Sequence, residues 1–135
     1  MRPTALLFLF CAAGLVADAA TLSADDAAAS DAAMQWLQVL DSAKYNDAAE
    51  MMAQEIRNQR DWIGYFTKHR TAFGRASKRH LTQVKHTSTL SGVVEIRKYA
   101  IIRFKTSFDR GSVAIEEVTL GKLGCCWEVF NYKVE

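Results

Sequence analysis

The hydrophobic pattern of this chain changes its period at Gly74, and this change limits the possible folds more than any other feature. Before Gly74, apolar residues recur at spacings of three and four, which is typical of amphipathic helices. After it, four segments rich in β-branched and aromatic residues are typical of strands. Helices followed by strands predict an α+β domain, with three N-terminal helices packed on one face of a curved four-stranded antiparallel sheet.

The expected helices begin at short polar residues that can accept a hydrogen bond from the first helical turn. These caps are Ser23 for the first helix, Asn46 or Asp47 for the second, and Asn58 or Asp61 for the third. The first helix should end near Ser42, and the third carries Phe66 and extends as far as Phe73 at most. Strands are expected within 78–87, 95–108, 112–120 and 125–134.

Residues 1–19 have the three parts of a secretory signal peptide. Arg2 precedes an uncharged apolar run, and small residues at Ala17 and Ala19 suit a cleavage site. The run is shorter than the roughly 20 residues that span a bilayer. We expect cleavage near Ala19, a periplasmic or secreted protein with no transmembrane anchor after cleavage, and a single α+β domain over 20–135.

Basic residues gather in the middle of the chain, where 62–94 contains no Asp or Glu. The candidate basic surface consists of Lys68, Arg75, Lys78 and Lys85. Such a surface could bind anionic lipid headgroups, a polyanionic glycan or an acidic partner, or it could simply be solvated. Nucleic acid is not expected, because the protein is exported and the segment has no paired stacking platform beyond Phe66 and Phe73.

Glu116 is the carboxylate expected to point into the core. The other residues on its face of the segment 114–120 are apolar, so strand alternation turns this side chain inward. A buried carboxylate needs a cation or several hydrogen-bond donors. Arg79, which shares a strand face with Leu81, is the expected partner, and Arg70 is the second choice. Such a pair can be structural or part of a ligand site.

The sequence has no nucleophile elbow, phosphate-binding glycine loop, dinucleotide fingerprint or zinc-protease helix. We therefore predict no catalytic residues and no cofactor. A domain of this class can still enclose a pocket between sheet and helices, where acid/base chemistry needs no motif. Candidates for such a pocket, which could equally serve in packing, are Trp36, Asp41, Tyr45 and Tyr99.

Cys125 and Cys126 are neighbours near the C-terminus. Their Cα atoms should be about 3.8 Å apart, below the usual range for a disulfide, so a bond between them would be strained. We expect small apolar residues at the start of a strand, and a disulfide within or between chains and a metal site stay open. His80 and His86 share a strand face roughly 20 Å apart, too far to bind one zinc ion, so no metal is predicted.

Several sequence blocks, in their order and spacing, resemble those of a bacterial secreted family known only as an uncharacterised domain, number 4019. They are "WLQVLDSAKYNDAAEMMAQEIR", "HRTAFGRASKR", "YAIIRFKTSF", "EEVTL" and "WEVFNYKV", and they cover nearly all of 20–135. The resemblance implies a small exported bacterial domain with a cone-like, cystatin-like α+β fold similar to nuclear transport factor two and scytalone dehydratase. It implies no reaction. The chain departs from the family in "SGVVEIRK", which lacks a usual proline, and in "GKLGCCW", where a polar turn is usual.

Together these observations predict an exported noncatalytic domain. It would bind a small ligand or a protein partner through the concave sheet or the basic surface. The alternative is a small pocket enzyme with acid/base chemistry of the lyase or isomerase kind. Oligomer formation is left open.

Overall fold

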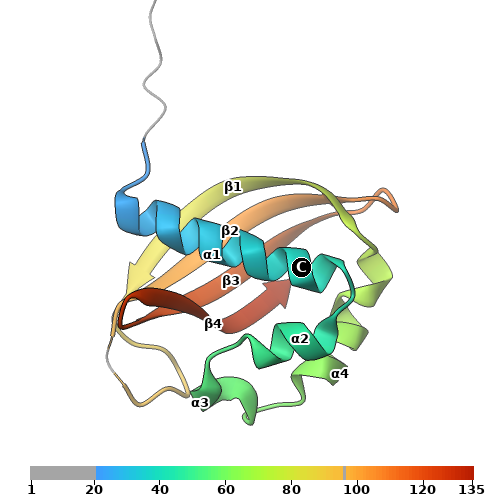
Figure 1. Ribbon diagram of the computed structural model, residues 1–135. Helices are drawn as coiled ribbons and strands as arrows, with labels where there is room; N and C mark the ends of the chain where they lie inside the picture. Colours follow the sequence, from blue (N-terminus) through green and yellow to red (C-terminus); the bar gives the residue numbers. More distant parts are fainter. Residues whose placement is uncertain (1–20, 96) are drawn as a thin grey trace, which may run out of the picture.

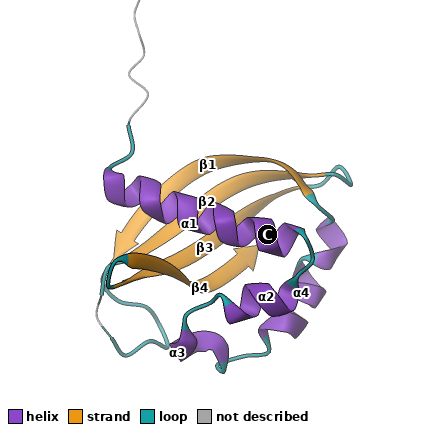
Figure 2. Cartoon of the chain, viewed as in Figure 1, coloured by secondary structure: helices purple, strands orange, loops and turns teal. Residues whose placement is uncertain are grey.

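The computed structural model describes residues 21–95 and 97–135. The expected signal peptide and its cleavage near Ala19 lie outside the described residues. The described chain forms one antiparallel sheet with helices beside it, so the predicted α+β class is confirmed (Figures 1 and 2). No helix of the described part is both long and apolar enough to cross a membrane.

The helices precede the strands along the chain. They are α1 (Ala24–Asp41), α2 (Tyr45–Glu50), α3 (Gln54–Arg57), α4 (Trp62–His69) and a short 3-10 helix, η1 (Thr71–Phe73). The strands are β1 (Ala76–Thr87), β2 (Tyr99–Phe108), β3 (Val113–Leu123) and β4 (Cys126–Val134). Neighbouring strands pair in the order β1-β2-β3-β4, which confirms the predicted four-stranded antiparallel sheet.

Helix α1 lies across one face of the curved sheet (Figure 1). It starts as expected, because the Ser23 hydroxyl accepts a hydrogen bond from the Asp26 backbone N–H at 3.1 Å. Its apolar stripe includes Trp36 and Leu40, which are buried in the core. The Trp36 ring packs against Tyr132 of β4 with a centroid distance of 5.4 Å. The residues that predicted the helix are therefore those that join it to the sheet.

The second expected helix is divided into α2 and α3, so the described chain has four α-helices rather than three. The break lies at Met52 and Ala53, where the backbone joins the edge of the sheet. The Ala53 N–H donates to the Val129 carbonyl at 2.8 Å, and Met52 forms a parallel bridge with Val129. A backbone group that bonds to a strand cannot also continue a helical ladder, so this contact ends α2.

The third expected helix is α4, and Asp61 rather than Asn58 is its cap. The Asp61 carboxylate accepts a hydrogen bond from the Gly64 N–H at 3.0 Å. Phe73 lies outside α4, in η1. Gly74 then adopts a φ of 79°, which favours glycine, and the chain turns into β1 as the change of period predicted.

The two faces of the sheet differ. We call the face under α1 the inner face and the opposite one the outer face. Along β2, the buried inner residues alternate with less buried outer ones. Helix α1 lies across the inner face, and α2, α3 and α4 lie toward the β4 edge, where Phe66 of α4 packs against Tyr132 of the inner face (Figure 1).

Part of the outer face carries its own aromatic contact, between Tyr99 and Phe130, with ring centroids 5.4 Å apart. Gly121 lies beneath these rings. A Cβ atom at this position would lie 2.5 Å from Phe130 Cε2 and 2.9 Å from Tyr99 Cε1. The absence of a side chain at Gly121 therefore lets both rings lie against the sheet.

The two edge strands, β1 and β4, are protected from further strand pairing in different ways. The segment around Met52 covers part of the β4 edge. In β1, two register irregularities interrupt the pairing with β2, between Ala76 and Lys78 and between Leu81 and Gln83. Bulges and lysines on an edge strand discourage another strand from adding to it.

Ion pairs fasten the N-terminal turn of α1 to the sheet. Asp25 accepts hydrogen bonds from Lys98 at 2.5 Å and from Lys122 at 2.9 Å. These bonds lower the pKa of Asp25 to about 2. Beside them, His86 Nε2 lies 2.6 Å from Asp26 Oδ1.

We expect the start of α1 to loosen in acid. The pKa of Asp25 is lower in the folded chain than its ordinary value of 3.8, so the stabilisation is present above about pH 4 and is lost as the pH falls toward 2. Hydrogen exchange followed by mass spectrometry between pH 4 and pH 2 should show falling protection of residues 24–30, after correction for the intrinsic rate. Asp25→Asn should reduce this pH dependence, and an unchanged profile in that variant would contradict the assignment.

Candidate functional site

A cluster of charged and hydroxyl side chains lies between α1 and the inner face of the sheet. We call it the inner ion cluster; its members are Asp41, Arg70, Arg79, Thr106, Glu116 and Tyr132. They come from the C-terminal end of α1, the residue after α4, and one position in each strand. The cluster thus connects all four strands to two helices.

Glu116 is fully buried and is held from several sides. Arg79 donates to it through Nε at 2.7 Å and through Nη2 at 3.2 Å. The hydroxyls of Thr106 and Tyr132 each donate to a different carboxylate oxygen at 2.6 Å. The pair that strand alternation predicted is therefore present, and hydroxyl donors complete the shell of Glu116.

Asp41 bridges the two arginines. Arg79 Nη1 and Nη2 donate to its two carboxylate oxygens at 2.6 and 2.7 Å, and Arg70 Nη2 donates at 2.6 Å. Arg70 also donates to the Gly74 carbonyl, and its guanidinium stacks over the Phe108 ring. The side chains of Arg70, Arg79 and Asp41 are 2%, 5% and 13% exposed, so the cluster is nearly sealed from solvent.

The electrostatics of the cluster favour one fixed set of charges. Burial alone lowers the pKa of Arg79, but hydrogen bonds to Asp41 and Glu116 outweigh it and raise that pKa above its ordinary value. Burial, followed by the charge of Glu116, raises the pKa of Tyr132 far above its ordinary value of 10.0. Arg79 therefore stays charged and Tyr132 stays neutral at physiological pH.

This arrangement leaves little for catalysis. Two arginines balance two carboxylates, and each oxygen of Glu116 already accepts two hydrogen bonds. A general base needs a free acceptor within reach of its substrate. The geometry thus favours a structural pair over a ligand site.

The remaining pocket candidates do not gather around one cavity. Trp36 donates its indole N–H to the Ala48 carbonyl at 2.8 Å inside the core. The Tyr45 hydroxyl lies 3.1 Å from that of Thr71. Tyr99 belongs to the outer face and donates to the Glu95 carbonyl at 3.0 Å. Only Asp41 joins Glu116 and Arg79.

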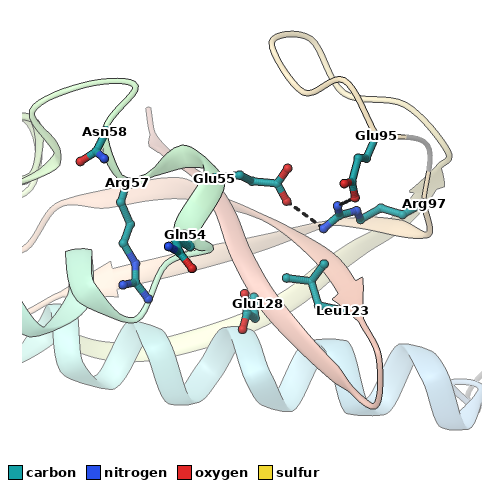
Figure 3. A pocket seen from close by; sticks show the side chains of 8 residues that line it. All are labelled: Gln54, Glu55, Arg57, Asn58, Glu95, Arg97, Leu123 and Glu128. Carbon is teal, nitrogen blue, oxygen red and sulfur yellow. Dashed lines mark hydrogen bonds and ion pairs between the residues drawn. The ribbon is translucent and has the colours of Figure 1, made fainter.

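The α3 groove is an open hollow of about 770 Å³ beside α3, lined largely by polar side chains (Figure 3). Arg97 lies between two carboxylates in it: Glu55 on α3, 2.8 Å away, and Glu95. The Arg97 guanidinium also lies over the Phe130 ring, at 5.4 Å from its centroid.

The other groups in the α3 groove add no catalytic arrangement. Arg57 donates through Nε to the Met52 carbonyl at 2.8 Å. Glu128 lines the groove from β4. Over 21–95 and 97–135, no three His, Cys, Asp or Glu side chains are placed to hold a metal ion. The α3 groove can accept a small polar molecule, and its three glutamates, Glu55, Glu95 and Glu128, outnumber its two arginines by one.

A smaller groove of about 290 Å³ lies on the outer face, between the segment before β2 and the start of α4. Ile101 and Phe130 contribute apolar surface from the sheet, and Trp62 lines it from α4. Arg60 and Lys133 also line this groove, so it combines apolar and cationic surface.

The open part of the outer face carries a group of exposed basic residues. We call it the outer basic face; its members, all exposed and placed together by the strand register, are Lys78, His80, Lys85, Arg103, Lys105 and Lys133. Two acidic residues lie beside it. Glu117 binds Arg103 at 2.8 Å, and the backbone of Glu135 pairs with Ile115.

The expected basic surface overlaps this face only in part. Of the four residues proposed, Lys78 and Lys85 lie on it, Lys68 lies on α4, and Arg75 lies just before β1. The arginines of the same basic segment that point inward belong to the inner ion cluster. The positions missed, Arg103 and Lys105, alternate with buried residues along β2, and that alternation is a signal the sequence contained.

The expectation for the cysteines is also corrected. Cys125 and Cys126 are exposed rather than packed, and they form a disulfide with each other. Cys125 lies in the turn between β3 and β4, and Cys126 is the first residue of β4.

Residues 32–132 match the family model described as a protein of unknown function, DUF4019. The chain belongs to this family. No curated protein and no solved structure matches the chain. The DUF4019 match starts within α1, ends at Tyr132, and includes every member of the inner ion cluster.

Proposed function

We propose that this DUF4019 protein is an exported, noncatalytic domain that binds an anionic lipid surface through the outer basic face. The observation that carries the proposal is the placement of five Lys and Arg residues, with His80, on the part of the sheet that no helix covers. The signal-peptide features of residues 1–19 support export to the periplasm or beyond. The strongly curved sheet is compatible with the cone-like type of fold that the sequence resemblance implies (Figure 2).

The positive charge of the outer basic face and its exposed apolar side chains both support a lipid surface as the partner. A basic residue next to an anionic membrane contributes about 1 kcal/mol of binding free energy, and clusters of four to eight are typical of such sites. Val113 and Ile115, on the same face of β3, are 55% and 40% exposed. Aliphatic side chains among cations can enter the headgroup region of a bilayer, where the acyl boundary offers them an apolar partner.

The alternative, a small pocket enzyme, has weaker support. Its best carboxylate, Glu116, is sealed in the core with its hydrogen-bonding capacity already in use. The smaller groove lined by Trp62 and Phe130 suits a small amphipathic ligand, but its cationic rim extends the outer basic face through Lys133. We therefore treat this groove as part of the same binding surface.

Vesicle binding tests the proposal. Protein recovered from an exporting host, with its N-terminus read by mass spectrometry, is sedimented with vesicles of phosphatidylcholine alone or with one third phosphatidylglycerol. We expect binding to the anionic vesicles only, weakening as salt rises, because screening reduces the attraction. Lys105→Gln with Lys133→Gln should lower the partition coefficient roughly ten- to thirtyfold, since two cations are lost.

The matched control is Lys44→Gln with Lys68→Gln, which removes the same charge from two exposed residues away from the sheet, Lys44 just before α2 and Lys68 on α4. It should change binding by less than about threefold, because only the charge near the membrane contributes fully. Equal losses in both variants, or equal binding to neutral vesicles, would contradict the proposal. Binding to immobilised heparin without binding to vesicles would replace the lipid surface by a polyanionic glycan.

A further inference from the structure

The disulfide between Cys125 and Cys126 has no evident structural task. It lies at the end of the β3–β4 hairpin, next to Gly124, which has a φ of 62°. Both cysteines are exposed, so the bond supports no core packing. The disulfide therefore differs from the usual disulfide of an exported domain, which joins distant parts of the chain.

The hairpin does not depend on the bond. A disulfide stabilises a fold mainly by restricting the unfolded chain, and this effect grows with the length of the loop it closes. Here the loop is the shortest possible, because the two residues are neighbours. The backbone ladder of β3 and β4 continues to the turn through pairs such as Lys122 with Trp127. The Lys122 N–H also donates to the Lys98 carbonyl at 2.9 Å, which ties β3 to the start of β2.

The position of the bond suits attack from solvent. Thiol–disulfide exchange needs a thiolate to reach one sulfur, so exposed disulfides are the labile, regulatory or catalytic ones. Cys125 lies in the turn and outside the strand ladder, whereas Cys126 pairs with Leu123. Both cysteines are exposed, and we take Cys125 as the point of attack because its backbone lies outside the strand ladder.

We propose that Cys125 and Cys126 form a thiol–disulfide exchange site that oxidises a partner protein with two thiols. A partner thiolate attacks the sulfur of Cys125 and forms a mixed disulfide, and Cys126 leaves as a thiolate that takes up a proton. The second partner thiolate then attacks the partner's own sulfur in that mixed bond, and Cys125 leaves in the same way. Two electrons pass to this chain, the partner gains a disulfide, and this chain gains two thiols.

The first test measures reduction. The oxidised protein is equilibrated in a series of glutathione buffers, quenched with acid and alkylated, and the peptide with residues 125–126 is weighed, so Cys11 does not enter the result. We expect half reduction at a ratio of reduced to oxidised glutathione at least about tenfold lower than folded lysozyme requires. The thermal midpoints of the oxidised and reduced forms should agree within about 2 °C, since the bond restricts so little chain.

The second test captures the mixed disulfide. A thioredoxin variant that retains only its attacking cysteine should form an adduct with the wild-type protein, mapped to Cys125. The Cys125→Ser/Cys126→Ser variant should fold with an unchanged thermal midpoint and form no adduct. The proposal is wrong if the site resists reduction as lysozyme does, if reduction lowers the thermal midpoint by more than about 10 °C as loss of a structural bridge would, or if an adduct forms at Cys126 alone. Isolation of the protein with both thiols already free, without added reductant, would also overturn it.

Discussion

Glu116→Gln should lower the free energy of unfolding by about 3–5 kcal/mol, because it leaves a buried positive charge without its full partner. In the wild-type chain, two arginines face two carboxylates in a site almost closed to water. The amide keeps one acceptor oxygen, so it can accept a hydrogen bond from Thr106 or from Tyr132 but not from both, and it cannot balance the charge of Arg79. The loss is a large fraction of the 5–15 kcal/mol typical of a whole domain. Urea unfolding, followed by tryptophan fluorescence, measures it.

The adjacent residue provides the control. Glu117 also forms an ion pair, with Arg103 at 2.8 Å, but it points to the outer face, where the arginine side chain is 50% exposed. Glu117→Gln should cost less than about 1 kcal/mol, as is usual for exposed pairs. The two variants make the same chemical change one position apart. Equal effects would mean that burial of the inner ion cluster does not determine its contribution.

A double-mutant cycle separates a structural pair from a ligand site. Arg79→Ala alone should also cost about 3–5 kcal/mol, and the double variant should cost clearly less than the sum of the two, because neither charge is then left unpaired. If Glu116 were instead held for a ligand, Glu116→Gln would leave stability unchanged or raise it. An additive cycle would argue against the direct pair.

The sequence was most informative where the pattern within a single helix or strand determines which residues are buried. Alternation within β3 was enough to turn Glu116 inward, and the period of α1 was enough to find its buried face. The four strands were found because each segment is itself rich in β-branched and aromatic residues. The break between α2 and α3 could not be found in this way, because it depends on the contact of Ala53 with Val129 in β4.

The inner ion cluster could be predicted only in part, because it too depends on contacts between different elements. Arg70 and Asp41 were both singled out, but Arg70 follows a helix and Asp41 ends one, and helix packing decides that Asp41 lies between Arg70 and Arg79. The basic segment 62–94 does not form one surface, because adjacent charged side chains in a strand point to opposite faces. Lys78 and Arg79 are neighbours in sequence, yet one lies on the outer basic face and the other in the core.

Arg70→Met is expected to lower the free energy of unfolding by about as much as Glu116→Gln does. It leaves an unbalanced negative charge, whereas Glu116→Gln leaves a positive one. The Met side chain can keep part of the apolar contact with the Phe108 ring, while the hydrogen bonds to Asp41 and to the Gly74 carbonyl are lost. Asp41 and Glu116 then share a single cation. We expect a loss of about 3–5 kcal/mol in the free energy of unfolding, which is the usual cost of an unbalanced buried charge.

Charge balance predicts that a second substitution should partly repair this variant. Asp41→Asn alone should destabilise the wild-type chain, because it leaves two arginines with one carboxylate. In the Arg70→Met background it restores one cation to one anion, Arg79 with Glu116, so it should cost at least about 1 kcal/mol less than in the wild type, within the range of couplings between residues in contact. The same urea titrations measure all four proteins. If Asp41→Asn costs as much in both backgrounds, the inner ion cluster is held by its separate hydrogen bonds rather than by its balance of charge.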